Sequence, residues 1–508
     1  MDTNRKKQMS LGVILSYVSI VVKLASGIIY TPFVLHTLGQ SQYGIYSLCI
    51  SFVGYLTILN AGVNAAYIRF YVQEKAVDEE NIEKLNGLFC KIFIVLSAIG
   101  LIGGLLIAQF STVIFGDKIT PSEYELVKRC FLLLAFMIAV EIFSCLFKSF
   151  LTANEEFIFS KSIDVISAIL APVLTIPFLF HGANCTIIIG IRLVIALIVL
   201  SLDIIFCHKK LSIRFHFSKV EVGLLKNIMY FTGFIFLQSI MDQMNWQIDK
   251  LILARMQGTS EISIYSVGTT FNNLYMTISA SVAGVFIAET NRLVALNENQ
   301  KIDNLFIKTS RICAYVTLII MIEYSFLGSS FIKTWAGLEY SASYTVGFLL
   351  MFPLTFSLCL GLGQDITRAR NKHGMQVLLD FSICIVNVII SIPFALKWGA
   401  VGSAMGTFIS EIVLCCIIQP IYYHKVVGLN MLKTYKSLFK IMLGGIAPIL
   451  YGMMINNLDL IHENYLSIGI HGVIIFVIYS ISVYTISFDT YEKEMLNILF
   501  RKVYNTKK

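Results

Sequence analysis

The chain has 508 residues, of which 56% are hydrophobic and only 14% are charged, and its formal net charge is +8. A soluble domain usually has about a quarter of its residues charged, so this composition does not suit one. Apolar runs long enough to cross a bilayer recur from end to end, which indicates an all-α, polytopic membrane protein.

The positive charge and the cysteines have ordinary explanations in such a protein. Lys and Arg are concentrated in short loops between the apolar runs, where they set membrane topology, so we expect no nucleic-acid partner. The eleven cysteines are scattered through apolar segments without a CxxC pair, and the eight histidines do not cluster with them. We therefore expect small buried thiols and no metal site.

We predict about fourteen membrane spans, and the first is a retained helix because its apolar run is too long for a signal peptide. In chain order the spans are Ser10–Leu35, Tyr43–Phe70, Gly87–Phe110, Cys130–Thr152, Phe157–Phe180, Asn184–Cys207, Asn227–Leu253, Ser263–Thr290, Phe306–Ile332, Ser343–Gln364, Gly374–Leu396, Val401–Tyr423, Leu438–Leu458 and Ile468–Phe488.

The distribution of Lys and Arg orients these spans. With the N-terminus in the cytoplasm, most basic residues fall in cytoplasmic loops, including the loop from His208 to Lys219. The outer loops receive only Lys118, Lys128, Arg129, Arg255, Lys333 and Lys397. Because cytoplasmic loops are enriched in Lys and Arg, we predict that both termini are cytoplasmic.

A pattern in the first two spans occurs twice. The stretch GQSQYGIYSL, Gly39 to Leu48, returns about 219 positions downstream as GTSEISIYSV, Gly258 to Val267. Ahead of the first copy is a polar stripe at helical spacing, formed by Ser19, Lys23, Ser26 and Tyr30. In the second copy the matching positions hold Gln238, Asp242, Asn245 and Asp249, so a cation is replaced by an anion.

The repeat extends to the later spans. DVISAILAPVLTIPF, from Asp164, matches DFSICIVNVIISIPF, from Asp380, and each is followed by Gly-Ala. Spans 1–6 and 7–12 are therefore two copies of a six-helix unit in parallel orientation. We predict two pseudo-symmetric lobes, residues 1–215 and 216–430, followed by residues 431–508 with helices 13 and 14 and a cytoplasmic tail.

Charged residues inside the spans are the candidate functional groups. Each costs roughly 2.5–3.5 kcal/mol to insert, so a chain retains one only where it faces protein or a wet cavity. We predict a polar cavity that binds an anion through Lys23, Arg192 and Arg69. The candidates for coupling transport to a cation are the carboxylates Asp242, Asp249, Asp164, Asp380 and Glu323.

Each of these residues could instead have a purely structural role. A charged side chain that pairs with a neighbour, or that reaches the membrane interface, can hold helices in register without binding a substrate or a coupling ion. The same structural role is open for Glu141 and Glu411. The chain contains no nucleotide-binding or hydrolase motif, and its loops are short. We therefore expect neither enzymatic activity nor a cofactor.

The sequence resembles one family of transporters. Its basic start, the segment TPFVLHTLGQSQYGIYSL and the following ILNAGVNAAYIRFY are similar to the polysaccharide repeat-unit flippases (O-antigen, capsule or exopolysaccharide) of the multidrug/oligosaccharidyl-lipid/polysaccharide (MOP) exporter superfamily. NWQIDKLILARMQGTSEISIYSV, which opens the second half, fits the same pattern. The similarity covers nearly the whole chain, with spans 13 and 14 matched least.

This resemblance implies a fold like that of the multidrug exporters, with alternating access to a central cavity in the bacterial cytoplasmic membrane. The implied substrate is an oligosaccharide unit on undecaprenyl pyrophosphate, moved from the inner to the outer leaflet and coupled to H⁺ or Na⁺. A polysaccharide polymerase is an implied partner.

Three other functions stay open at this point. A cation-coupled multidrug exporter has a similar fold, although the basic first lobe argues against cationic drugs. A lipid II flippase would also carry cavity cations. A polytopic glycosyltransferase or polymerase usually needs a sizeable outer loop, and here the outer loops are short.

Overall fold

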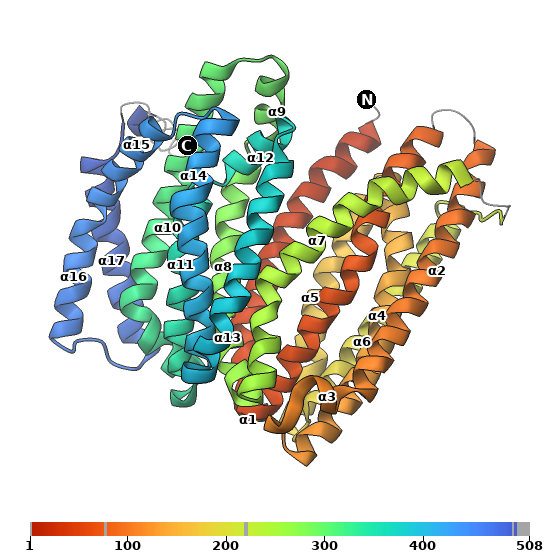
Figure 1. The fold of residues 1–508 in the computed structure, drawn as a ribbon, viewed down its shortest axis with the longest axis horizontal. Coiled ribbons are helices and arrows are strands. Elements are labelled where there is room, and N and C mark those ends of the chain that lie inside the picture. The colour runs from red at the N-terminus through yellow and green to blue at the C-terminus, as the bar shows by residue number, and fades with distance from the viewer. Residues whose placement is uncertain (1–2, 76–78, 218–221, 490–491, 495–508) are drawn as a thin grey trace, which may run out of the picture. The chain divides into compact units, whose positions relative to one another are not determined.

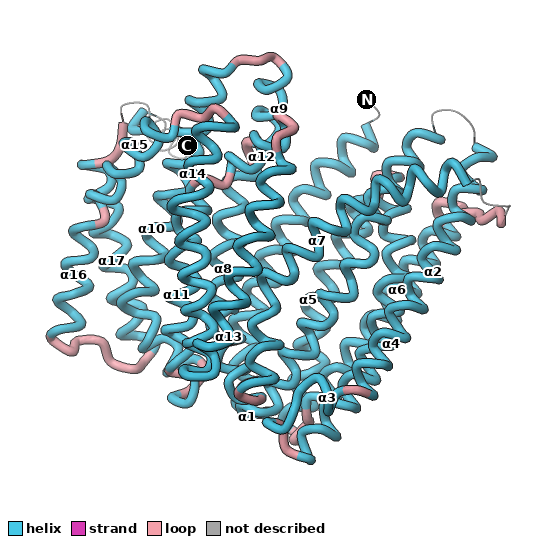
Figure 2. The backbone as a smooth tube through the Cα atoms, viewed as in Figure 1, coloured by secondary structure: helices cyan, strands magenta, loops and turns pink. Residues whose placement is uncertain are grey.

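The computed structural model describes residues 3–75, 79–217, 222–489 and 492–494, without the side chains of some helical residues such as Asp242 and Asn245. These described residues form helices joined by short loops, and they contain no strand (Figures 1 and 2). The chain divides into two compact units, Met1–Ser266 (unit 1) and Val267–Lys508 (unit 2).

Unit 1 holds the long apolar helices of the first half and the start of the second. Its elements are α1 (Thr3–Lys75), α2 (Glu79–Gln109), α3 (Ser111–Phe115), η1 (Gly116–Lys118), α4 (Pro121–Ala153), α5 (Phe157–Phe180), α6 (Cys185–Lys209), α7 (Val222–Met256) and the first turns of α8 (Thr259–Gly284). Within this unit α1 packs against α4 and α5, and α4 packs against α2 and α6 (Figure 1).

Unit 2 contains the remaining helices, and α10 is central to its core. Its elements after α8 are α9 (Ile287–Ala295), α10 (Asn299–Trp335), η2 (Leu338–Tyr340), α11 (Ala342–Cys359), α12 (Leu362–Ala369), α13 (His373–Ile412), η3 (Val413–Ile418), α14 (Gln419–Tyr422), η4 (Tyr423–Val427), α15 (Met431–Gly444), α16 (Ile446–Asn457) and α17 (Tyr465–Ile486). The division between the units falls within α8, so it does not coincide with the loop at which the sequence repeat was divided.

The predicted fold class is confirmed. Among the described residues, ten helices are long and apolar enough to cross a membrane, and the bent pair α8–α9 makes an eleventh. Two of the ten each hold two predicted spans joined at a kink. One is in α1, with its kink at Gly39, and the other is the helical stretch Gly374–Val427, which begins in α13 and is kinked at Trp398–Gly399. With α7, which covers the seventh prediction, every predicted span falls on helix, and the chain is a multi-pass membrane protein.

Three predicted spans were wrong in their extent or continuity. The predicted eighth span is broken where α8 ends and α9 begins, with a bend of 44°. The tenth is broken between α11 and α12, at Leu360–Gly361. The thirteenth starts at Met431 and not at Leu438, and it is split at Gly445. In each case local turns interrupt a run whose hydropathy is continuous, and hydropathy does not detect turns.

The backbone supports the internal repeat. Positive φ angles are uncommon outside glycine, so their recurrence at one spacing identifies equivalent loops. They occur at Gly39 and Gly258, Gly116 and Gly337, Glu155 and Asn371, Gly182 and Gly399, and Ser212 and Gly428. Each pair is separated by nearly the 219 positions between Ser47 and Ser266 of the repeated motif. The two six-helix copies therefore share their loop conformations as well as their sequence pattern.

The last helices pack on α10 inside unit 2. Ile319, Ile322 and Leu327 of α10 form one buried cluster with Ile455 of α16 and with Ile468, Ile475, Tyr479 and Val483 of α17. The residues that follow α17 return to the same helix, because Glu492 forms an ion pair with Arg311 of α10.

Arg311 is almost completely buried, and its guanidinium nitrogens donate hydrogen bonds to several neighbouring groups. Its Nε donates to Glu492 Oε1 at 2.8 Å and its Nη2 to Oε2 at 2.7 Å, a two-pronged pair. Nη1 donates to Ser437 Oγ at 2.9 Å, and Nη2 also donates to the Ser487 carbonyl oxygen at 2.7 Å. A buried cation with this many partners fixes α10, α15 and the segment after α17 together.

We predict that Glu492→Ala lowers the free energy of unfolding by about 3 kcal/mol, because it leaves the buried Arg311 without its carboxylate. The measurement is thermal unfolding of purified protein in detergent. Glu463→Ala, which breaks the exposed Lys333–Glu463 pair, is the matched control and should change the midpoint little. Equal shifts for the two variants would contradict this role of Arg311.

The same pair predicts a pH dependence. Burial opposes ionisation of Glu492, but hydrogen bonds from Arg311 and the Asp489 backbone outweigh it and hold the pKa of Glu492 below its usual range. A carboxyl with a lowered folded-state pKa contributes stability above its unfolded pKa, and loses it as pH falls through the folded value. The midpoint difference between wild type and Glu492→Gln should therefore shrink below about pH 4.3. A difference that stays constant from pH 7 to pH 3 would contradict this.

Candidate functional site

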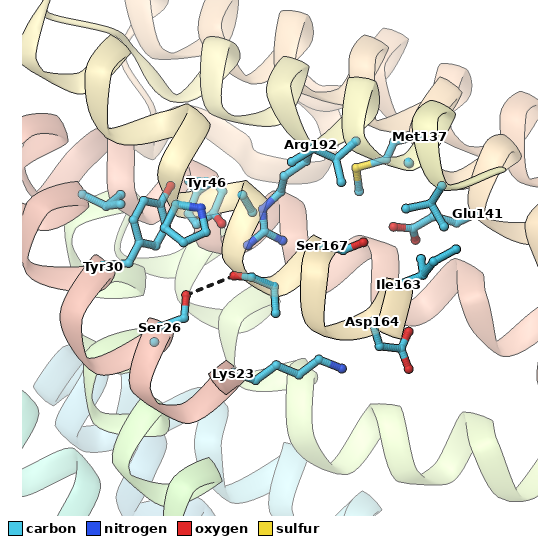
Figure 3. A pocket seen from close by; sticks show the side chains of 18 of the residues that line it. Lys23, Ser26, Tyr30, Tyr46, Met137, Glu141, Ile163, Asp164, Ser167 and Arg192 are labelled. Atoms are coloured by element: carbon cyan, nitrogen blue, oxygen red, sulfur yellow. Dashed lines mark hydrogen bonds between the residues drawn. The ribbon is translucent and has the colours of Figure 1, made fainter. Parts of the chain in front are cut away.

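A polar cavity of about 690 Å³ lies inside unit 1, between α1, α4, α5 and α6 (Figure 3). Its wall carries three basic and two carboxylic side chains: Lys23, Lys148, Arg192, Glu141 and Asp164. The rest of the lining includes hydroxyl groups on three of the four helices and small residues of α5. A cavity of this size with several convergent polar groups is the expected form of a small-molecule or headgroup site.

Lys23 and Arg192 both line this cavity, as we expected from their positions inside predicted spans. Among the described residues, neither lies within 4.0 Å of a carboxylate oxygen. The Arg192 guanidinium lies 5.5 Å from the centroid of the Tyr46 ring, which is cation–π range. Figure 3 shows Lys23 directed toward Asp164, and Arg192 directed into the space beside Tyr46 and Ser167. Both cations thus face the cavity.

The polar stripe of the first span folds as predicted, with one exception. Lys23, Ser26 and Tyr30 line the cavity, and Ser26 Oγ donates to the Ala168 carbonyl oxygen at 3.4 Å. Ser19, one turn earlier, is buried and does not line it. The stripe therefore forms the α1 wall of the site.

Lys148 is a cavity residue that the sequence analysis missed. Met137, Glu141, Ser144 and Lys148 of α4 all line the cavity, and they follow each other at the same four-three-four spacing as the stripe on α1. This spacing was the signal that could have identified Lys148. Among the described residues it has no ion-pair partner within 4.0 Å, so the cavity holds three such cations.

The carboxylates of the cavity differ in their surroundings. Asp164 accepts from Lys161 Nζ at 3.2 Å, one turn earlier on α5. Glu141 lies across the cavity from Lys23 (Figure 3). Behind the wall, the buried Asp203 of α6 accepts from Ser144 Oγ at 3.4 Å. The cavity wall therefore carries acidic groups as well as basic ones, and among the predicted coupling residues with described side chains only Asp164 lines it.

The other predicted site residues whose side chains the structure describes lie outside this cavity. Arg69 is exposed near the C-terminal end of α1, with its guanidinium 6.0 Å from the Phe70 ring, and does not line the cavity. Asp249 of α7 is buried and accepts from Tyr265 Oη at 2.7 Å. Asp242 is on α7, and its side chain lies outside the described residues.

Glu323 of α10 and Asp380 of α13 belong to unit 2, where both are half-buried. Within the described residues, no three His, Cys, Asp or Glu side chains are grouped so as to hold a metal ion.

Comparison with known proteins identifies relatives that match more than half of the chain. A family model described as "Polysaccharide biosynthesis protein" matches residues 37–345, more than half of the chain. A Shigella flexneri protein named "Putative O-antigen transporter" is 21% identical over 394 residues, which are 77% of this chain and 92% of the relative.

Solved transporter structures share the fold. Lipid II flippase MurJ, in an inward closed conformation, superposes with a TM-score of 0.73 at 17% identity, over 94% of this chain and 99% of that one. An inward-facing multidrug resistance MATE family transporter of the MOP superfamily has a TM-score of 0.64 at 13% identity, over 78% and 92% of the two chains.

These relatives are flippases or transporters by name, and the solved structures share the helical fold. The resemblance found in the sequence is therefore confirmed at the level of the family: the chain belongs to the polysaccharide biosynthesis protein family, is a membrane flippase or transporter, and has the fold of these solved transporters.

Proposed function

We propose that this protein moves an oligosaccharide unit carried on undecaprenyl pyrophosphate from the inner to the outer leaflet of the bacterial cytoplasmic membrane. The observation that carries the proposal is the cavity of unit 1, with three basic side chains that are outside ion-pair distance of any described carboxylate. The name of the Shigella relative supports the same class of substrate.

The chemistry of the cavity suits a diphosphate better than a neutral or cationic ligand. Lys23, Lys148 and Arg192 supply charge-assisted donors from three different helices, so they can surround an anion with several oxygens. Tyr30, Tyr43 and Tyr46 add ring faces and hydroxyls, which suit sugar rings and their hydroxyl groups. The lipid chain stays in the bilayer while this polar headgroup occupies the cavity.

Two further parts of the proposal come from the sequence. The Lys and Arg distribution places both termini in the cytoplasm. We assign coupling to H⁺ or Na⁺ to carboxylates, and of the candidates with described side chains Asp164 lines the cavity. Asp249 is better explained as structural, because Tyr265 already satisfies it in a buried environment.

The direct test of the proposed function is deletion of the gene. Lipid-linked repeat units should accumulate on the inner leaflet while drug susceptibility stays at the parental level. Increased drug susceptibility with normal surface polysaccharide would favour a multidrug exporter. Arrested peptidoglycan synthesis would favour a lipid II flippase, which handles the same diphosphate group on a different glycan.

We predict that Lys23→Gln combined with Arg192→Gln lowers the rate of flipping roughly a hundredfold or more, because two charge-assisted bonds to the diphosphate are lost. The measurement is restoration of surface polysaccharide in the deletion strain, with membrane-inserted protein quantified in parallel. Lys128→Gln with Arg129→Gln removes the same charge from an exposed part of α4 and should restore fully. If the cavity double variant also restores fully, the anion site is elsewhere.

We predict that Asp164→Asn uncouples transport, because a neutral amide cannot exchange a proton or attract Na⁺. In reconstituted vesicles the variant should equilibrate substrate between leaflets while no longer responding to an imposed pH or Na⁺ gradient. Glu125→Gln, at an exposed i,i+4 pair with Arg129, is the control. An unchanged gradient response in Asp164→Asn would return the coupling role to Asp242, Glu323 or Asp380.

A further inference from the structure

Three buried cysteines from three different helices meet in unit 1. Cys49 of α1, Cys130 of α4 and Cys185 of α6 have no exposed surface. Cys130 Sγ lies 3.5 Å from Cys185 Sγ and 3.6 Å from Thr186 Oγ1, and the Cys49 thiol is within hydrogen-bond distance of Cys130. We expected small buried thiols scattered through the apolar segments, but these three form one cluster.

The cluster lies at the ends of α4 and α6 that the Lys and Arg distribution assigns to the outer face. Cys185 is the first residue of α6, directly after the N-cap Asn184 and an exposed loop. Cys130 directly follows the exposed Arg129, one of the few basic residues predicted on the outer side. Disulfides form and persist on the outer side of a bacterial cytoplasmic membrane, whereas cytoplasmic thiols stay reduced. The position of this pair therefore permits oxidation.

The two sulfur atoms are placed for a covalent bond. An S–S bond is about 2.05 Å long, so each Sγ atom has to move by only about 0.7 Å from the present separation of 3.5 Å. A rotation of roughly 25° about each Cα–Cβ bond moves a sulfur that far, which keeps both side chains close to their rotamers. The bond therefore needs no rearrangement of α4 or α6.

A bond between Cys130 and Cys185 would join two walls of the candidate cavity. Met137 and Arg192 line the cavity, and each lies seven residues beyond the cysteine of its own helix, on the same helical face. The loop closed by the bond contains α5, which supplies another wall and Asp164. A covalent link here would hold the outer ends of these helices at one separation while Arg192 binds and releases a ligand.

We propose that Cys130 and Cys185 are joined by a disulfide in the cell and that this bond fixes α4 to α6 at the outer end of the cavity. The structure holds all eleven cysteines as thiols and so describes the reduced protein. The proposal rests on the membrane orientation proposed above and not on the substrate. The deletion phenotype reports the substrate, so the two proposals fail independently of each other.

Oxidation removes two electrons and two protons from the two thiols, and the acceptor is the disulfide of a thiol oxidoreductase on the outer side of the membrane. The Cys185 thiolate attacks that disulfide while the loop before α6 is still exposed during insertion, and a mixed disulfide forms. The Cys130 thiolate then attacks the Cys185 sulfur and releases the oxidoreductase as a dithiol. Because both cysteines are buried after folding, the finished bond is protected from reductants.

Peptide mapping without reduction tests the bond directly. Membranes are denatured in N-ethylmaleimide, and the full-length protein is digested and analysed by mass spectrometry. We expect most of the protein to yield one linked peptide that contains Cys130 and Cys185. Cys313 and Cys359, two buried thiols near the predicted cytoplasmic ends of α10 and α11, are the matched controls and should carry maleimide. Maleimide on both Cys130 and Cys185 in most of the protein, or a link from Cys130 to Cys49, would overturn the proposal.

Thermal unfolding distinguishes a bond from simple packing of two thiols. Cys130→Ser and Cys185→Ser remove the same bond, so each should lower the unfolding midpoint by about 4 °C or more, and the double variant should lower it no further. Cys49→Ser changes the third thiol of the cluster and should leave the linked peptide intact. Additive losses in the double variant, or a wild-type midpoint in either single variant, would overturn the proposal.

Discussion

Basic side chains inside a membrane-spanning helical unit are costly, and this cost constrains the rest of unit 1. Lys23, Lys148 and Arg192 lie on three different helices, and no described carboxylate is within ion-pair distance of them. They can remain there only because they face a polar cavity, where water or a ligand solvates them. The same wall also carries hydroxyl groups, tyrosine rings and two carboxylates. These groups keep the cavity polar, and they do not form direct ion pairs with the three basic side chains.

The internal repeat explains how one chain builds both a polar site and a contact between its two copies. The recurring positive φ angles show that the two six-helix copies keep their loops, while the side chains on their equivalent helices have diverged. Lys23 of the first copy lines a cavity, whereas the matching position of the second copy is the acidic Asp242. Ser47 and Ser266, by contrast, are unchanged and bond to each other. The two copies therefore differ at the cavity position and agree at the serine of the contact. This is the pattern expected for a duplicated unit whose copies have acquired different roles.

Much of this architecture could be predicted from the sequence, because hydropathy and periodicity report spans and faces. The spans, the repeat, the family and the cavity positions of Lys23 and Arg192 follow from such patterns. Lys148 was missed although it lies inside the predicted fourth span and its stripe on α4 has the same spacing as the stripe on α1. The breaks between α8 and α9 and at Gly445 come from local turns, to which hydropathy is blind. The roles of Asp249 and Arg69 depend on tertiary neighbours, such as Tyr265, that a single sequence does not identify.

The most direct measurement is a structure of the protein with a lipid-linked oligosaccharide diphosphate bound, determined by electron cryomicroscopy in nanodiscs. The account predicts density for the two phosphates within hydrogen-bond distance of the Lys23, Lys148 and Arg192 side chains, with the first sugars against Tyr30 and Tyr46. Diphosphate density outside unit 1, or a cavity of unit 1 that stays filled by water alone when the substrate is bound, would contradict it.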